Sequence, residues 1–187
     1  MIILLGFPKS GTSSFQKLFT DLGYKSFHWK KGGHFIGTLI KHNKATNRPL
    51  LSGFAASDCI AQMDVCVDAD NAYWPQLTDY QQLYQENPTA LFILNKRSPE
   101  SLLSSFKRWG NLNARLQKYN PEILHDGSDE AFLALVRTHY ANVAEFFAAR
   151  PAKFIAYDIE KDPVQKLGKY LDLKGIKAFP KMNVGKV

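Results

Sequence analysis

The chain has 187 residues, of which 45% are hydrophobic and 13% aromatic, enough for the core of a single domain spanning residues 1–187. A net charge of +7 favours an anionic ligand, while the lack of a long Lys and Arg run argues against nucleic acid as a partner. The N-terminal apolar run is too short for a signal peptide or membrane insertion, and Cys59 and Cys66 are too few for a disulfide framework, so we expect a cytoplasmic protein with two buried free thiols.

The N-terminal segment predicts a strand, a turn, a helix and a second strand. Residues 2–5 are a short apolar run that ends at a glycine. Residues 12–22 predict a helix, because large apolar side chains recur there at i, i+3, i+4 and i+7. Residues 24–29 (YKSFHW) predict the second strand, with His28 near its end. A strand, a helix and a strand over about thirty residues form a βαβ unit, which predicts a parallel sheet.

The rest of the chain continues this alternation. Apolar periodicity predicts helices at 34–42 and 75–86, whereas residues 57–74 predict an irregular segment beside a ligand cleft. Residues 90–94 (ALFIL) predict a strand buried on both faces, and Ser98 and Pro99 then begin a helix that ends near Trp109. The C-terminal part predicts a long helix, a strand, a shorter helix and an aperiodic tail, at 129–150, 153–157, 162–171 and 175–187.

Repeated strand and helix patterns of this kind predict an α/β fold with three layers, α/β/α, and a central parallel sheet similar to that of P-loop nucleotide-binding proteins. Ligands of such folds bind at the carboxyl ends of the strands. Three segments are expected at that edge: the turn after Leu5, the strand end at His28 and the turn after Leu94.

The turn between the first strand and the first helix has the features of a phosphate-binding loop. Gly6 and Gly11 bound the turn, and the helix start supplies N–H groups and a partial positive charge. Lys9 adds a full charge. The pattern Gly6-x-x-x-x-Gly11-Thr12 resembles a Walker A loop, but the Walker lysine directly follows the second glycine, where this chain has Thr12.

The strand at 90–94 ends in Asn95-Lys96-Arg97 instead of the aspartate that holds a metal ion in Walker-type proteins. A Mg²⁺-bound triphosphate is therefore a poor match. A nucleotide that donates a monoanionic group without a metal fits this loop better.

Two signatures resemble those of the sulfotransferases. The family's 5′-phosphosulfate loop, P-K-[ST]-G-T-[ST], is matched by Pro8-Lys9-Ser10-Gly11-Thr12-Ser13-Ser14. Its second signature is an Arg at a strand end followed eight residues later by a helical Ser, which is the spacing of Arg97 and Ser105. The order of loop, strand, Arg and helix also matches.

This resemblance implies an enzyme, a sulfotransferase that uses PAPS (3′-phosphoadenosine 5′-phosphosulfate), releases PAP and needs no metal. It implies that residues 8–14 hold the 5′-phosphosulfate and that Arg97 and Ser105 bind the 3′-phosphate. Lys9 can reach the bridging oxygen, which gains negative charge as the sulfonate leaves. The sulfonate would pass by in-line displacement to a hydroxyl or amine of a small or exposed acceptor.

An acceptor that loses a proton needs a general base. Among the five histidines, His28 is the first choice, because it ends the second predicted strand beside the loop and its ordinary pKa of about 6.5 suits a base. Asp64, in the segment before the strand that leads to Arg97, is the second choice. The sequence leaves both open.

The family's third cofactor signature, a basic loop with glycine near the C-terminus, has one candidate here, at residues 181–186 (KMNVGK). Two alternatives to the sulfotransferase interpretation remain. A P-loop kinase or nucleotide hydrolase predicts Mg-ATP binding. A non-catalytic module for a bisphosphate nucleotide predicts binding without turnover.

Overall fold

The computed structural model describes residues 1–182, and its main sheet has seven strands. Five of them are parallel, in the spatial order β2 (Ser26–His28), β5 (Cys59–Gln62), β1 (Ile2–Leu4), β8 (Leu91–Lys96) and β9 (Lys153–Asp158). An antiparallel pair, β3 (Lys30–Lys31) and β4 (His34–Phe35), extends the sheet beyond β2. The predicted α/β fold with a central parallel sheet is confirmed.

β1 is the central one of the five parallel strands and lies beside β8, and the apolar residues of both strands are buried on both faces. Ile3 pairs with Ile60 of β5 on one side and with Phe92 of β8 on the other. Phe92 in turn pairs with Phe154 of β9. This register aligns the carboxyl ends of β1 and β8, from which the two predicted signatures continue.

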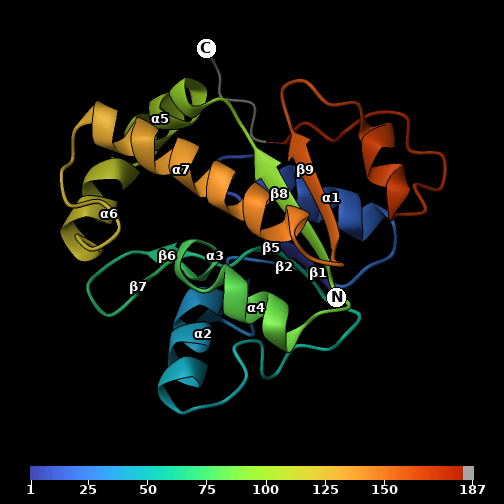
Figure 1. The fold of residues 1–187 in the computed structure, drawn as a ribbon, viewed down its shortest axis with the longest axis horizontal. Coiled ribbons are helices and arrows are strands. Elements are labelled where there is room, and N and C mark those ends of the chain that lie inside the picture. Colours follow the sequence, from blue (N-terminus) through green and yellow to red (C-terminus); the bar gives the residue numbers. More distant parts are fainter. Residues whose placement is uncertain (183–187) are drawn as a thin grey trace.

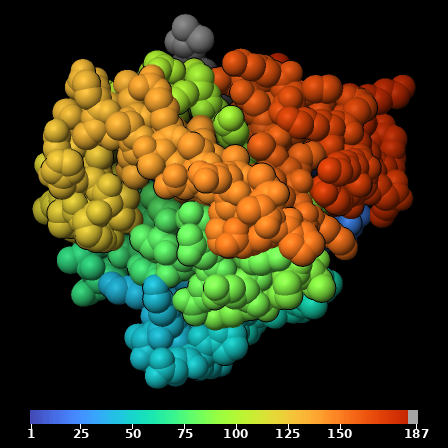
Figure 2. All heavy atoms as spheres, viewed as in Figure 1, coloured from blue at the N-terminus to red at the C-terminus, as the bar shows by residue number. Residues whose placement is uncertain are grey.

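Helices cover both faces of the sheet, which gives the predicted three layers (Figure 1). Successive side chains of a strand point to opposite faces. Ile3 therefore packs in one core with α2 (Ile36–Ala45), α4 (Tyr80–Glu86), α5 (Pro99–Arg108) and α7 (Asp129–Ala148). Ile2 packs in the other core with α1 (Thr12–Asp21) and the 3₁₀ helix η1 (Val164–Lys169). In the space-filling view, α7 and α4 lie against each other over the first face (Figure 2).

The prediction of an irregular segment at 57–74 was wrong. Residues Cys59–Gln62 form β5, which lies between β1 and β2, and β6 (Val65–Cys66) pairs with β7 (Ala72–Tyr73) in a second, two-stranded sheet. All four residues of β5 are buried although one of them is Gln62. A strand this short, with a polar residue at its end, gives little periodicity, so its strand conformation depends on pairing with both neighbours.

Several helices differ from their predicted bounds. The helix predicted at 34–42 begins at Ile36, because the preceding two residues form β4. The helix predicted at 75–86 is divided into α3 (Pro75–Thr78) and α4 by Asp79, whose buried carboxylate accepts hydrogen bonds from Tyr73 and Thr78. The helix predicted at 162–171 is the 3₁₀ helix η1, and a further helix, α6 (Leu112–Tyr119), lies between α5 and α7.

Ser128 caps α7 by accepting a hydrogen bond from the N–H of Ala131. The prediction of two buried free thiols is confirmed. Cys59 and Cys66 are both free and buried, and burial raises the pKa of their thiols, to about 12 and about 11. Among the described residues, none of the helices has the length and apolar character that crossing a bilayer requires.

The strand order changes direction between β1 and β8. The chain places β2 and β5 on one side of β1, and β8 and β9 on the other. In open α/β sheets the loops at such a point diverge and leave a crevice for a ligand at the carboxyl ends of the strands. The loop after β1 and the turn after β8 both lie at this point.

Candidate active site

The loop at residues 6–11 joins β1 to α1 through two residues in the left-handed backbone region. Lys9 has φ 68° and Gly11, the N-cap of α1, has φ 78°. A non-glycine residue in this region costs free energy and is typical of functional sites. No side chain caps α1, so its first-turn N–H groups face the loop without a capping oxygen. This arrangement is suited to binding an anion.

Asn95, at the end of β8, holds the loop in place from below. Its Nδ2 donates to the carbonyl oxygen of Ser10 (3.0 Å) and to Ser10 Oγ (2.6 Å), while its Oδ1 accepts from the N–H of Gly6 (2.8 Å). A Cβ at Gly6 would lie 2.0 Å from the carbonyl oxygen of Asn95, so only glycine fits there. Asn95 is completely buried, and the sequence analysis missed its role. A polar residue directly after a fully apolar strand is the signal that points to it.

Phe7 anchors the same loop to the core beneath it. Its ring lies 5.3 Å from that of His139 and 6.3 Å from that of Phe106, both in edge-to-face geometry. His139 Nε2 is 2.7 Å from the carbonyl oxygen of Leu5, and burial lowers the pKa of this histidine to about 4. His139 is therefore a neutral core residue that holds the end of β1.

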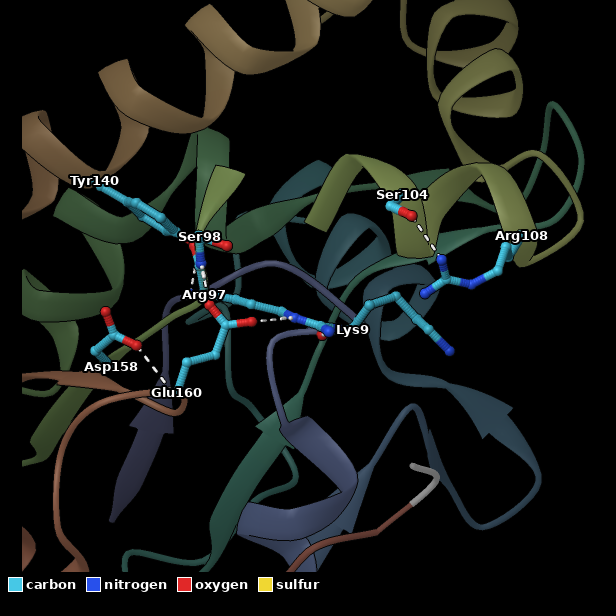
Figure 3. Close-up of polar contacts among 8 residues, drawn as sticks. All are labelled: Lys9, Arg97, Ser98, Ser104, Arg108, Tyr140, Asp158 and Glu160. Atoms are coloured by element: carbon cyan, nitrogen blue, oxygen red, sulfur yellow. Dashed lines mark hydrogen bonds and ion pairs between the residues drawn. The ribbon is translucent and has the colours of Figure 1, made fainter. Parts of the chain in front are cut away.

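Three cationic side chains converge above the loop: Lys9, Arg97 and Arg108 (Figure 3). Burial lowers the pKa of Lys9, and the charges of Arg97 and Arg108 lower it further. Arg108, at the end of α5, is held by Ser104, whose Oγ accepts from its Nη1 at 2.6 Å. Arg108 was not among the predicted site residues. Cations that repel one another in this way favour an anion between them.

Arg97 follows β8 and reaches back to the loop. Its Nη1 donates to the carbonyl oxygen of Lys9 (3.2 Å), and its Nε donates to Glu160 Oε1 (3.1 Å). Glu160 also accepts the N–H of Ser98 through Oε2 (3.0 Å), so one carboxylate fixes both the guanidinium and the start of α5. This positioning carboxylate was not predicted.

Ser105 lies on the inner side of α5 and is buried. Within residues 1–182, no hydrogen bond joins it to Arg97, the residue with which the sequence signature pairs it. The structure thus places Arg97 directly after β8 and Ser105 on α5.

Lys9 also contacts Trp109, which follows α5 and is 45% exposed. The Lys9 ammonium is 4.8 Å from the centre of the indole ring, and the guanidinium carbon of Arg115 is 5.4 Å from it. Both distances are within the range of a cation–π interaction. Trp109 therefore stabilises the Lys9 side chain above the loop.

His28 and Asp64, the two candidate bases, lie at opposite ends of one hydrogen-bonded chain. His28 Nε2 is 3.0 Å from Thr12 Oγ1. Thr12 donates to Gln62 Oε1 (3.0 Å), and Gln62 Nε2 donates to Asp64 Oδ2 (3.1 Å). The parallel pairing of β2 with β5 places His28 opposite Gln62. Gln62 was missed because its strand was not predicted.

Burial shifts the pKa of both candidate bases. It lowers the pKa of His28 to about 4, an effect that a hydrogen bond to the residue's own backbone opposes and that the charge of Lys9 strengthens. It raises the pKa of Asp64 to about 7, although hydrogen bonds from Gln62 and Gln76 act in the opposite direction. His28 is consequently neutral at pH 7, and both oxygens of Asp64 already accept hydrogen bonds.

Two serines of the loop signature, Ser10 and Ser14, are buried. The Ser10 hydroxyl is completely buried and is committed to Asn95 and the carbonyl oxygen of Phe7. Ser14 Oγ accepts from the N–H of Met182 (3.1 Å), which brings the C-terminal segment to the start of α1. Most of the basic segment predicted at 181–186 lies outside the described residues.

Two cavities differ in their relation to this site. A cavity of about 220 Å³, lined among others by Met1, Phe54 and Glu86, lies at the amino end of β1, away from the loop. A cavity of about 10 Å³, room for about one water molecule, is lined by Gln62, Asp64 and Trp109 and adjoins the hydrogen-bonded chain. The smaller one belongs to the site. Within residues 1–182, no three His, Cys, Asp or Glu side chains are grouped as a metal site would require.

Comparison with known proteins identifies the family. A family model described as "Sulfotransferase domain" matches residues 1–187, the whole chain. Among solved structures, the chain is similar to the YorR protein from Bacillus subtilis in complex with phosphorylated GDP, at 16% sequence identity and a TM-score of 0.40, over 90% of this chain and 91% of that chain. No match is found among curated proteins. By the match to its whole length, the chain belongs to the sulfotransferase domain family.

Proposed function

We propose that this sulfotransferase uses PAPS as its donor and moves the sulfonate group, without a metal, to a hydroxyl or amine of a small or exposed acceptor. Membership of the family establishes sulfotransfer in general. The observation that supports the specific donor is the convergence of Lys9, Arg97 and Arg108 on a loop whose helix start lacks a side-chain cap.

The site fits a donor with two separated anionic groups. The N–H groups of residues 8–14 and the Lys9 ammonium suit the 5′-phosphosulfate. Arg97, which presents a rigid fork beside the loop, suits a 3′-phosphate, and Arg108 adds a second guanidinium. In this proposal Pro8, Gly11, Thr12, Ser13, Ser14 and Ser105 complete the binding site, and Ser10 acts indirectly by fixing the loop conformation.

Each residue contributes to the chemistry through its charge or its proton. His28, which is neutral at pH 7, takes the proton of the acceptor as the acceptor oxygen or nitrogen bonds to sulfur. The bond between sulfur and the bridging oxygen breaks, and its electron pair stays on the phosphate oxygen. Lys9 and the loop amides stabilise the charge that develops there, more strongly in the transition state than in the ground state.

Thermal unfolding with added nucleotide tests the donor class. PAP at 100 times its Kd is expected to add about 2.7 kcal/mol to the stability of the folded protein, whereas Mg-ATP at the same concentration gives a smaller shift. Release of PAP from PAPS in the presence of a panel of alcohols, phenols and amines then tests turnover. Stabilisation by Mg-ATP and none by PAP would overturn the proposal, and PAP binding without turnover on any acceptor would favour a binding module.

A further inference from the structure

The direction of each hydrogen bond in the chain from His28 to Asp64 follows from where the hydroxyl proton of Thr12 lies. An ionised carboxylate can only accept hydrogen bonds, so Gln62 must turn its amide nitrogen toward Asp64, as the 3.1 Å contact shows. Gln62 Oε1 then faces Thr12 and accepts its hydroxyl proton at 3.0 Å. Thr12 therefore has no hydroxyl proton left to donate to His28.

Thr12 can consequently act only as an acceptor toward His28. The 3.0 Å contact between Thr12 Oγ1 and His28 Nε2 therefore requires a hydrogen on Nε2. A neutral imidazole has one N–H, so Nδ1 keeps its lone pair. The alternative, with the proton on Nδ1, would place two acceptors against each other at 3.0 Å in a partly buried site.

We propose that Asp64 and Gln62 are positioning residues that fix His28 in its Nε2–H tautomer and leave Nδ1 as the basic nitrogen. The catalytic meaning of this inference rests on the proposed function. In the transfer, Nδ1 accepts the acceptor proton while Nε2–H stays on Thr12, and the ring becomes an imidazolium. His28 and Asp64 are then not rival bases, because Asp64 acts through His28.

Two features of the site favour the other tautomer, so the tautomer of His28 has to be measured. The hydrogen bond between the His28 side chain and its own backbone competes for the ring proton. Burial raises the pKa of Asp64 to about 7, and a protonated Asp64 would allow Gln62 to reverse its amide. The tautomer must therefore be measured about 1.5 units above this value, where Asp64 is ionised.

Two-bond ¹H–¹⁵N correlation spectra of the uniformly ¹⁵N-labelled full chain at pH about 8.5 distinguish the two tautomers of a neutral histidine. We expect Nε2–H for His28. His139 is an internal control, because its Nε2 lies 2.7 Å from a carbonyl oxygen and must be protonated. A spectrum of His28 with the proton on Nδ1 would overturn the inference, and this result needs no variant.

Variants then test whether Asp64 is the cause. In Asp64→Asn, the new amide can pair with either orientation of Gln62, so an Nδ1–H population of His28 is expected to appear. The exchanged pair Gln62→Glu with Asp64→Asn puts beside Thr12 a carboxylate, which can only accept its proton, and is expected to restore Nε2–H. In Ser13→Ala, which removes the hydroxyl 3.4 Å from Nε2, the tautomer should not change.

An Asp64→Asn spectrum identical to that of the wild type would overturn the role of Asp64. If that variant does not fold, the exchanged pair decides, because Nδ1–H in it would contradict the proposal.

Activity separates this inference from the proposed function. PAP release by Asp64→Asn should fall at least tenfold in kcat with little change in KM for PAPS, and the exchanged pair should recover part of it. The expected tautomers in a protein that neither binds PAP nor turns over PAPS would contradict only the proposed function. Turnover with His28 in the Nδ1–H form would contradict only the inference.

Discussion

The loop at residues 6–11 and the chain from His28 to Asp64 both lie at the carboxyl edge of the sheet, but they are held in different ways. The loop is fixed by contacts within and directly beneath it, from Phe7 and Asn95. The chain exists because two strands distant in sequence, β2 and β5, pair side by side. The loop presents backbone N–H groups and fixed charge, whereas the chain presents a proton whose position depends on several side chains. In the proposed function, the loop binds the donor and the chain removes the proton, and the two parts of the site meet at Thr12.

Among these variants, Lys9→Ala is expected to have the largest effect, and it tests the loop side of the site. The ammonium is proposed to stabilise the leaving oxygen, so turnover should fall by about 10²–10³-fold, as for loss of one transition-state donor. PAP release at saturating PAPS measures it. Lys30→Ala, which removes an equal charge at the exposed first residue of β3, should have little effect. Equal losses in the two variants would mean that general positive charge, and not its placement, matters.

Arg97→Ala tests whether the loop side of the site binds a second phosphate group of the donor. Loss of a charge-assisted contact should weaken PAP binding by about 10–100-fold. Binding of 5′-AMP, which has no 3′-phosphate, should change much less, and isothermal titration calorimetry measures both. Arg137→Ala, which breaks an exposed ion pair with Glu100, is the matched control. A parallel loss of affinity for PAP and 5′-AMP would place Arg97 outside the 3′-phosphate site.

Asn95→Ala tests how the loop is held. Without this amide, the N–H of Gly6 and the carbonyl oxygen of Ser10 lose a buried partner, and each such loss costs about 1–3 kcal/mol. The free energy of unfolding should fall by about 2–4 kcal/mol in urea denaturation, and PAP affinity should fall with it. Gln81→Ala, which truncates an exposed amide on α4, should change stability by less than about 0.5 kcal/mol. A free energy of unfolding near that of the wild type would show that the loop keeps its conformation without Asn95.

Asp64→Asn tests the electrostatics of the chain with the smallest expected effect. Because burial raises the pKa of Asp64 from 3.8 to about 7, the folded protein binds this proton where the unfolded chain has released it. Stability from this group is therefore present below pH about 4 and is lost as the pH rises through about 7. The variant does not titrate here, so its stability relative to the wild type should increase from pH about 5 to about 8. Urea denaturation at both pH values measures the difference, and a decrease would contradict a buried carboxyl group.

Sequence patterns predicted the strands and the helix that carry the loop side of the candidate site. The apolar run of β1, the glycine-bounded turn, the amphipathic α1 and the strand that ends before Arg97 are each encoded within a few neighbouring residues. The roles of Asn95, Arg108 and Glu160 were not predictable, because each depends on a contact with a residue far along the chain or on which helix face turns toward the loop.

The hydrogen-bonded chain from His28 to Asp64 was not predicted from the sequence. His28 and Asp64 could be named as titratable residues near the expected edge, but as alternatives. Their connection needs Gln62, which lies in a strand too short and too polar at its end to be recognised. Only the insertion of β5 between β1 and β2 brings the three side chains together.

The sequence by itself determined the α/β architecture, the glycine-bounded loop between β1 and α1 and the charge of Lys9 and Arg97, because these depend on local periodicity, on glycine and on residue type. The tertiary structure decided the strand order, the three-cation cluster and the hydrogen-bonded chain that ends at Asp64. The physical reason is that backbone turns and helix faces are set by neighbouring residues, whereas pKa shifts and hydrogen-bond direction depend on burial and on partners. Those partners meet only when the sheet has formed.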